Sequence, residues 1–482
     1  MAATVTPPAA TTQHGTDHRP GPGHDPGLAQ TTPRHHASPQ VLLGAALLGF
    51  AVIGLDASAV NVALPAIGRG LGGTTSGLQW VVDAYTLMFA ALLLSAGAFS
   101  DRFGASRAYA AGLAVFTLAS AACGLAPSLG PLIGARLVQG SAAAVMLPSS
   151  LALVRQAFPD AAARARAIAL WTVGGAVATA LGPVVGGALT SAVSWRAIFY
   201  LNLPVGVAAL AVLARAARSP RRPAALDLPG QIAAVLGLGA LTYGVIEGGA
   251  AGFTRPATVA SLLIAAVAMA AFAGAERRAA DPMLPFGLFR DRVVSISVAI
   301  GFAVNAAFYG LVFVFGLYFQ DLLGMSAVRA GLMFLPMSAL IALANVGSAR
   351  AAVRFGPRVP MISGQVFCAA ALLLIAAFGA GAPRPVLALM LVPIGVGLGF
   401  TVPSLTAVMM GGIAPERAGM AGGVLNSARQ TGGALAVAAF GALVAQRADF
   451  LTGLRISLLV SAALLLATAG AALLLPRRIT TR

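Results

Sequence analysis

Charged side chains inside the long apolar runs of this sequence are the first candidates for chemistry. Asp56, Asp83 and Arg136 each stand in a run that is otherwise apolar or small. If these runs are membrane-crossing helices, a rise of ~1.5 Å per residue places Asp56 ~15 Å and Asp83 ~9 Å below one membrane surface, with Arg136 in the same layer. A charge at such a depth costs ~2.5–3.5 kcal/mol on insertion scales, so each of the three is a candidate functional group.

The chemistry that these residues predict is the binding and release of a proton. Desolvation favours the neutral form of a buried carboxyl group, whereas a nearby arginine favours its ionised form. A carboxyl group between these two influences can exchange a proton when its access to water changes. A static ion pair or a capped polar contact is the alternative interpretation, and the three residues alone leave it open.

Three further polar residues lie within apolar runs. Gln139 shares its run with Arg136. Arg429 lies ~18 Å from the opposite surface, and we expect it to pair with backbone carbonyl groups. Glu247 stands at the end of its run, where we expect an exposed carboxylate beside a loop.

Metal, disulfide and lysine chemistry are disfavoured by what these runs lack. All five histidines lie within the first 36 residues, and Cys123 and Cys368 are far apart inside apolar runs. All 31 basic residues are arginine, which excludes a P-loop lysine and a Schiff-base lysine. We therefore expect no cofactor, no metal centre and no enzyme activity. The histidines of the N-terminal tail could bind a metal ion, but its Pro, Gly and Thr content favours disorder.

Composition indicates which elements position the candidate residues. Of 482 residues, 58% are apolar before the 57 glycines are added, and 9% are charged. Soluble domains carry ~25% charged residues, so this chain has too little charge to cover a soluble surface. A polytopic helical membrane protein remains. Its formal net charge of +17 fits loops on the cytoplasmic side of a membrane better than a nucleic-acid-binding surface.

Apolar runs long enough to cross a bilayer, ~20 residues each, recur along the chain. We predict fourteen spans, at residues 41–65, 78–98, 108–126, 130–153, 166–190, 197–214, 229–247, 257–274, 293–317, 327–348, 359–380, 385–409, 419–444 and 456–475.

The arginines predict the orientation of these spans. With the N-terminus inside, 22 of the 31 fall in inner segments, seven in outer segments and two within spans. Cytoplasmic loops carry the excess of basic residues in membrane proteins. Both termini are therefore expected in the cytoplasm, which requires an even number of spans.

An internal duplication divides the spans into two sets. Gly140 precedes Pro148 by eight residues, as Gly395 precedes Pro403, and the loop at residues 101–104 recurs at 353–356. Duplicated six-helix halves with a site at their interface are a transporter arrangement. We expect a disordered cytoplasmic tail at 1–39, a six-helix bundle at 40–215, a linker with two extra spans at 216–280, a second bundle at 281–476 and a tail at 477–482.

Several motifs resemble those of the fourteen-span drug:proton antiporter family of the major facilitator superfamily, over about residues 41–478. The closest likeness is to actinobacterial exporters of the methylenomycin-resistance type. The matching motifs are Leu-Asp-Ala-Ser-Ala-Val-Asn-Val-Ala-Leu-Pro (55–65), Gly-Ala-Phe-Ser-Asp-Arg-Phe-Gly (97–104), Arg-Leu-Val-Gln-Gly (136–140), Gly-Pro-Val-Val-Gly-Gly (182–187), Trp195-Arg196 with Phe199 and Asn202-Leu-Pro204, and Arg-Gln-Thr-Gly-Gly (429–433).

This resemblance implies proton-coupled efflux of small hydrophobic or amphipathic compounds by alternating access, in the multidrug resistance manner. It implies a proton or cation role for Asp56 and proton transfer by Arg136, and we add Asp83 to this coupling group. Its implied partners are a drug or antibiotic, protons and the lipid bilayer, with no nucleic acid, for a monomer in the bacterial plasma membrane.

Two glycine-containing motifs receive roles from the same resemblance. The loop motif implies a conformational latch, in which Asp101 and Arg102 act with Gly97, Gly104 and Arg107. The span-five motif, the most specific of the set, marks antiporters and consists here of Gly182, Pro183, Gly186 and Gly187. Generic packing of small residues is the alternative for these glycines.

Two departures from the family pattern affect these expectations. Ala105 and Ser106 precede Arg107 where basic residues are usual, which predicts a weaker latch. Ser58 stands where threonine is usual and keeps the hydroxyl group.

Three other functions compete with drug export. A proton symporter importing a metabolite would use the same acids, and the span-five motif argues against it. A membrane-embedded enzyme would need nucleophile–base pairs or metal ligands at depth. A channel or sensor would not need the duplicated halves with a glycine-rich, proline-broken span.

Overall fold

The computed structural model describes residues 38–215, 219–221, 227–279, 282–379, 381–413, 418–445 and 449–475. The chain divides into two compact units, Met1–His36 and Ala37–Arg482, and every described residue belongs to the second. The expected tails, residues 1–37 of the first and 477–482, lie outside the described residues. Ser38 caps the first helix by accepting a hydrogen bond from the Val41 backbone N–H at 3.4 Å.

All regular structure in the described residues is helical. In chain order the elements are α1 (Pro39–Leu71), α2 (Thr75–Phe103), α3 (Ala105–Leu125), α4 (Leu129–Ala157), α5 (Ala161–Ala192), α6 (Arg196–Tyr200), α7 (Asn202–Leu213), α8 (Leu228–Ala251), α9 (Pro256–Arg278), the 3₁₀-helix η1 (Phe286–Arg290), α10 (Arg292–Leu317), the π-helix η2 (Tyr318–Leu322), α11 (Ala327–Met333), α12 (Leu335–Phe355), α13 (Arg358–Phe378), α14 (Arg384–Met390), α15 (Val392–Gly411), α16 (Ala418–Val444) and α17 (Phe450–Ala472).

The predicted spans correspond to these helices. Thirteen helical stretches are long and apolar enough to cross a membrane, and several consist of two consecutive elements, such as α6 with α7. The remaining predicted span, 419–444, coincides with α16, which has 27 residues and carries Arg429 and Gln430. The expected all-helical class with long apolar spans is confirmed.

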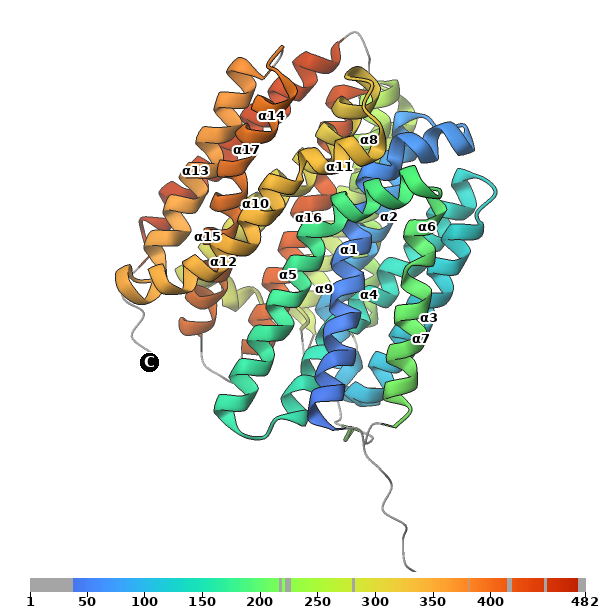
Figure 1. Ribbon diagram of the computed structural model, residues 1–482. Coiled ribbons are helices and arrows are strands. Elements are labelled where there is room, and N and C mark those ends of the chain that lie inside the picture. The colour runs from blue at the N-terminus through green and yellow to red at the C-terminus, as the bar shows by residue number, and fades with distance from the viewer. Residues whose placement is uncertain are drawn as a thin grey trace, which may run out of the picture. The chain divides into compact units, whose positions relative to one another are not determined.

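Helix packing in the first half of the chain recurs in the second. α1 packs on α5 as α10 packs on α16, α2 on α4 as α12 on α15, and α3 on α4 as α13 on α15. In addition, α1 and α3 pack on α7, as α10 and α13 pack on α17. Figure 1 shows α1, α3, α4 and α7 toward one side of this unit and α10, α12, α13 and α17 toward the other.

The repeated residues explain part of this symmetry. A Cβ on Gly140 of α4 would overlap the Tyr85 backbone of α2, and one on Gly395 of α15 would overlap the Met337 backbone of α12. Both glycines therefore allow the same close helix approach in their own half. The repeated loops also share a conformation, because α2 and α12 each end at a glycine with positive φ, Gly104 at +86° and Gly356 at +81°.

The inserted helices α8 and α9 pack mainly on each other, and α8 also packs on α2 and α16. α8 thus contacts one helix of each half. The Gln231 side chain of α8 donates to the Ala91 carbonyl of α2 at 2.9 Å.

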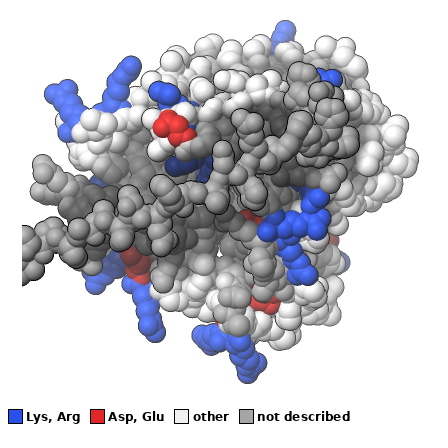
Figure 2. Space-filling model, turned by 90° about the horizontal axis from the view of Figure 1, so that it is seen from below, with Lys and Arg blue, Asp and Glu red and all other residues white. Residues whose placement is uncertain are grey.

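The two ends of this helical unit differ in charge. One end holds the start of α1 and the α2–α3, α4–α5 and α12–α13 turns, and we call it the arginine-rich end; the other holds the α1–α2 turn and is the arginine-poor end. Figure 2, seen from below Figure 1, shows blue Arg side chains around the rim of the face and few red ones. The start of α1 lies at the arginine-rich end beside the start of α3, because Tyr109 of α3 donates to the Ala45 carbonyl at 2.7 Å. The end of α17 lies there too, because Arg358 at the start of α13 donates to the Leu475 carbonyl at 2.6 Å.

Candidate functional site

The polar centre of the first half is an ion pair between α1 and α4. The Arg136 guanidinium of α4 donates to the Asp56 carboxylate of α1, and both side chains are fully buried. It is the only ion pair between described residues. Gln139, one helical turn beyond Arg136, accepts from the arginine at 2.9 Å and donates to Asp56 Oδ1 at 3.1 Å. One stretch of α4 thus supplies both the counter-charge and a neutral donor.

A third helix completes the contacts of the carboxylate. The Asn202 Nδ2 at the start of α7 lies 3.1 Å from Asp56 Oδ1 and 2.9 Å from the Ser120 hydroxyl of α3. Ser120 in turn donates to the Phe199 carbonyl at 2.8 Å. Asp56 is therefore held by residues of α4 and α7, with α3 behind them.

Arg136 has partners besides the acid. Its Nε donates to the Val81 carbonyl at 3.0 Å, and its guanidinium carbon lies 4.2 Å from the centre of the Tyr85 ring. The Phe199 ring centre lies at 5.9 Å. A cation over an aromatic face is stabilised when desolvated. The second terminal nitrogen of Arg136 is buried and has no hydrogen-bond partner in the described part of the chain. Among the described residues, Asp56 alone forms an ion pair with Arg136 and neutralises its charge.

The charge of Asp56 determines how this network is held together. An ionised Asp56 accepts three hydrogen bonds, one of them charge-assisted. A proton on Asp56 would remove the charge that Arg136 neutralises and weaken the contact between α1 and α4. The geometry thus places the buried charge of Asp56, its counter-charge and two neutral donors at the contacts of α1 with α4 and α7.

Asp83 is not part of this network. It is fully buried on α2, and neither carboxylate oxygen has a hydrogen-bond partner among the described residues. Nearby on the same helix, Gln79 donates to the Ala438 carbonyl of α16 at 2.8 Å. Of the three residues predicted to share a layer, the structure brings Asp56 and Arg136 into contact and leaves Asp83 on a helix that packs against α16.

The loop motif lies at the arginine-rich end. Asp101 and Arg102 are exposed at the end of α2, and Gly97, inside the helix, would tolerate a Cβ without contact. A Cβ on Gly104 would lie 2.8 Å from the Ser219 carbonyl oxygen. Arg107 begins the first turn of α3 by donating its N–H to the Gly104 carbonyl at 3.1 Å.

The span-five motif makes two close helix contacts. On one face, a Cβ on Gly182 or Gly186 would overlap Ser58 or Ala59 of α1. On another, a Cβ on Gly187 would overlap the Ala327 carbonyl of α11. Small residues at these positions let α5 approach both helices closely.

Pro183 takes part in the second of these contacts. It lies inside α5, and a Cβ on Gly331 of α11 would lie 2.5 Å from its carbonyl oxygen. Proline leaves one backbone hydrogen bond of the helix unmade, which is tolerated in membrane helices where neighbours pack closely. The motif therefore joins a helix of the first half to one of the second.

Hydrogen bonds between the halves accompany that contact toward the arginine-poor end. Gln320 of η2 donates to the Val62 carbonyl of α1 at 2.7 Å. The Val328 backbone N–H of α11 donates to the Ser191 hydroxyl of α5 at 2.9 Å. Together with Gln79, these bonds hold the two halves together at the arginine-poor end.

The other predicted polar residues lie elsewhere. Arg429 of α16 is partly buried, and its Nε donates to the Asn305 side chain of α10 at 3.1 Å, where we expected backbone carbonyls. Asn305 also donates to Gln430 at 3.3 Å. Glu247, where we expected an exposed carboxylate beside a loop, is half-buried inside the last turns of α8. Arg429 thus forms a separate polar cluster in the second half.

Sequence reasoning did not assign roles to Asn202, Ser120 and Tyr85. Asn202 was visible as an amide within an apolar span, but its partner lies on another helix 146 positions away. Only the packing of α7 against α1 and α3 brings it to Asp56.

Comparisons with known proteins bear on the family of the chain. Residues 46–437 match the Major Facilitator Superfamily. The methylenomycin A resistance protein of Streptomyces coelicolor is 38% identical over 420 residues, which are 87% of this chain and 88% of that protein. The multidrug resistance protein Stp of Mycobacterium tuberculosis is 38% identical over 403 residues, 83% of this chain and 74% of that protein.

A solved structure supports the fold alone. The crystal structure of a D-xylose-proton symporter aligns with a TM-score of 0.62 over 88% of this chain and 97% of that one, at 14% identity.

Proposed function

Because the chain belongs to the major facilitator superfamily, we propose that it exports small hydrophobic or amphipathic compounds, antibiotics among them, in exchange for protons. Support for the cargo comes from relatives that align over most of both chains and are named as resistance proteins for methylenomycin A and for multiple drugs. The protein is then a transporter and not an enzyme, and its partners are a drug, protons and the surrounding lipid.

The observation that carries the proton part is the buried Asp56–Arg136 pair. In our proposal a proton enters Asp56, the pair separates, and Arg136 keeps its contacts with Gln139 and the Tyr85 ring. Release of the proton restores the pair. Each protonation state favours one arrangement of the helices, and a driving ion shifts the population between them. Asp83, buried with no hydrogen-bond partner for its carboxylate among the described residues, is the second candidate for proton binding.

Alternating access would use the contacts between the halves. In this arrangement α5 and α11 are in close contact at Pro183 and Gly331, and we take this contact as the closure of the arginine-poor end. The opposite state would separate them and bring the halves together near the exposed Asp101–Arg102 loop, which acts as the latch. Rigid-body movement of duplicated halves is the general form of this motion.

The arginine-rich end faces the cytoplasm in this proposal, because basic residues are retained on that side of a bacterial plasma membrane. Both termini are then cytoplasmic, and the chain acts as a monomer. The functional units are a first bundle at 40–215, a linker with α8 and α9 at 216–280, and a second bundle at 281–476.

Import of a metabolite with protons is the alternative, and direction of flux separates the two. Inside-out membrane vesicles are loaded to an acidic interior, and uptake of ethidium and of methylenomycin A is followed. Export predicts accumulation of a probe inside these vesicles, and collapse when a protonophore removes the gradient. Accumulation only in right-side-out vesicles with an inward proton gradient would support symport instead. Membranes that lack the protein serve as the control.

A further inference from the structure

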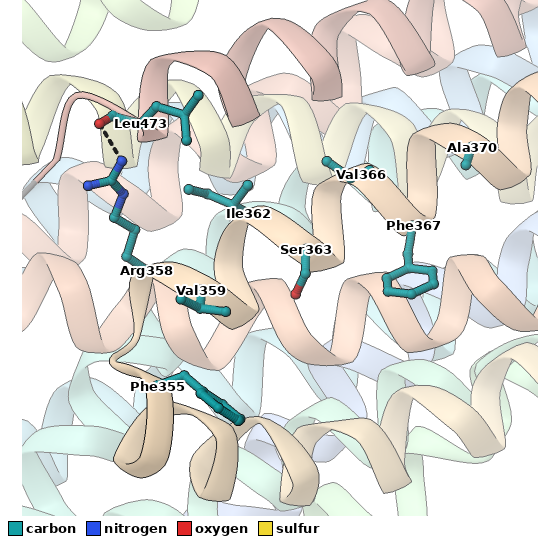
Figure 3. Close-up of a pocket in the computed structure, with 9 residues that line it drawn as sticks. All are labelled: Phe355, Arg358, Val359, Ile362, Ser363, Val366, Phe367, Ala370 and Leu473. Carbon is teal, nitrogen blue, oxygen red and sulfur yellow. Dashed lines mark hydrogen bonds between the residues drawn. The ribbon is translucent and has the colours of Figure 1, made fainter. Parts of the chain in front are cut away.

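An apolar groove of about 570 Å³ lies at the ends of α12, α13 and α17, away from the Asp56 site. It runs from Phe355 at the end of α12 along α13 to Ala370, with Leu473 of the residues after α17 on its other wall. Figure 3 shows Arg358 at the start of α13 reaching toward Leu473, with Val366, Phe367 and Ala370 farther along the helix. The volume is in the range of ligand pockets, ~300–1,000 Å³.

The length of the groove matches one leaflet of a bilayer. From Arg358 to Ala370 is twelve residues of α13, or ~18 Å of helix at ~1.5 Å per residue. Half of the hydrocarbon core is ~15 Å thick. Phe355 and Phe367, at its two ends, are 57% and 56% exposed, so the groove opens to the side of the helices. An acyl chain lying along α13 would therefore fill it from the arginine-rich surface to the bilayer centre.

The head of the groove is positive, and no described acid forms an ion pair with it. The Arg358 guanidinium donates to the carbonyl oxygens of Leu473 and Leu475, which carry no net charge. Arg354, in the last turn of α12, lies with its guanidinium carbon 5.1 Å from the centre of the Phe355 ring. Across α12, α13 and α17 the sequence contains neither Asp nor Glu. Arg358 lines this end of the groove, and Arg354 lies beside the lining residue Phe355. Two arginines so placed are complementary to a lipid with an anionic headgroup.

The repeated loops differ in a way that also favours an anionic ligand at this end of the groove. The first copy reads Asp101-Arg102-Phe103-Gly104 and the second Val353-Arg354-Phe355-Gly356. The acid of the first copy is thus replaced by Val353, which is 90% exposed. The second copy keeps the arginine and the aromatic ring but lacks the carboxylate that would repel an anion.

We infer that this groove, defined by Phe355, Arg358, Ile362, Phe367, Ala370 and Leu473, binds one anionic phospholipid. Its acyl chain lies along α13, and its phosphate group is held by Arg354 and Arg358. The lipid comes from the leaflet at the arginine-rich end and bridges α12, α13 and α17 in the second half of the chain.

Native mass spectrometry of the full-length protein tests this inference. The protein is released from nanodiscs of phosphatidylcholine mixed with phosphatidylglycerol, and the retained lipids are identified. We expect one phosphatidylglycerol to be retained in preference to phosphatidylcholine. Arg354→Gln, at an exposed side chain, should weaken retention about fivefold, the equivalent of ~1 kcal/mol per arginine near a charged surface.

Two further variants separate the groove from general surface charge. Ala370→Trp, at an exposed position, fills the apolar part and should reduce retention while leaving both arginines in place. Arg102→Gln changes the equivalent arginine of the first loop copy and should leave lipid retention unchanged.

Three results would overturn the assignment. They are equal retention of the two lipids by the unaltered protein, full retention by Ala370→Trp, and displacement of the lipid by ethidium. The first two would mean that headgroup charge or the groove has no part in binding. The third would mean that the groove takes transported compounds.

Discussion

Neutralising Asp56 should destabilise the protein by leaving Arg136 buried without a counter-charge. Asp56→Asn keeps the size of the side chain, and its amide oxygen can still accept from Gln139 or Asn202. The variant therefore loses the interaction with the guanidinium of Arg136, whose second terminal nitrogen already has no partner among the described residues. Removing one member of a buried ion pair costs ~3–5 kcal/mol, and the retained hydrogen bonds place this variant near the lower value.

Removing the second charge should restore much of that loss. In Asp56→Asn/Arg136→Gln no buried charge remains at the site, and Gln139 and Asn202 have neutral partners. Replacement of a whole buried pair by neutral groups is often without net effect on stability. We expect the double variant to be more stable than Asp56→Asn by ~2 kcal/mol, within the range of coupling between contacting residues.

Reversible denaturant titration of the purified variants in detergent micelles measures these free energies of unfolding. Asp101→Asn, at an exposed carboxylate, is the control and should lie within ~0.5 kcal/mol of the unaltered protein. The reasoning is refuted if the losses from Asp56→Asn and Arg136→Gln simply add in the double variant. Additivity would mean that the two charges do not depend on each other.

Three other changes have distinct expected outcomes. Asn202→Ala removes one donor to Asp56, so titration should show a loss of ~1.5–3 kcal/mol, less than for Asp56→Asn, and an unchanged value would exclude Asn202 from the network. Gly331→Leu forces α11 away from the Pro183 carbonyl. A cysteine placed at Ser191 should then react several-fold faster with a thiol reagent, and an unchanged rate would mean that this contact does not close the arginine-poor end. Asp101→Asn should slow exchange of ethidium roughly tenfold with equilibrium binding retained, and lost binding with normal turnover would contradict the latch.

The helices were predictable because each depends on a local pattern. Apolar length located the spans, and prolines and glycines located most of the turns. The repeated Gly140–Pro148 and Gly395–Pro403 spacings also predicted the symmetry, since each glycine sits where its helix crosses a partner. These patterns could not show that some spans consist of two consecutive helices, as α6 with α7 and α11 with α12 do.

The contacts between side chains were harder to predict from the sequence than the helices were. Depth along a helix placed Asp56, Asp83 and Arg136 in one layer, but depth does not specify the direction in which a side chain points around the helix axis. Asp56 and Arg136 face each other, whereas Asp83 finds no partner among the described residues. Asn202 was missed for the same reason, because its contact depends on how α7 packs against α1.

The glycine motifs received roles only by resemblance until the packing supplied a physical basis. Gly182 and Gly187 serve different neighbours, α1 and α11, although five residues separate them. The sequence shows small residues on α5 but not that they join the two halves at one end.

The most direct test of the central claim measures drug and proton movement together in proteoliposomes. One proton moving through ~100 mV supplies ~2.3 kcal/mol, enough for roughly fortyfold accumulation of a neutral compound. We predict that the unaltered protein accumulates drug against its gradient with proton counterflow. Asp56→Asn, and the double variant Asp56→Asn/Arg136→Gln with its restored stability, should equilibrate drug downhill without accumulating it. Unchanged gradient-driven accumulation by either variant, correctly folded, would show that the coupling proton binds elsewhere and would contradict the account.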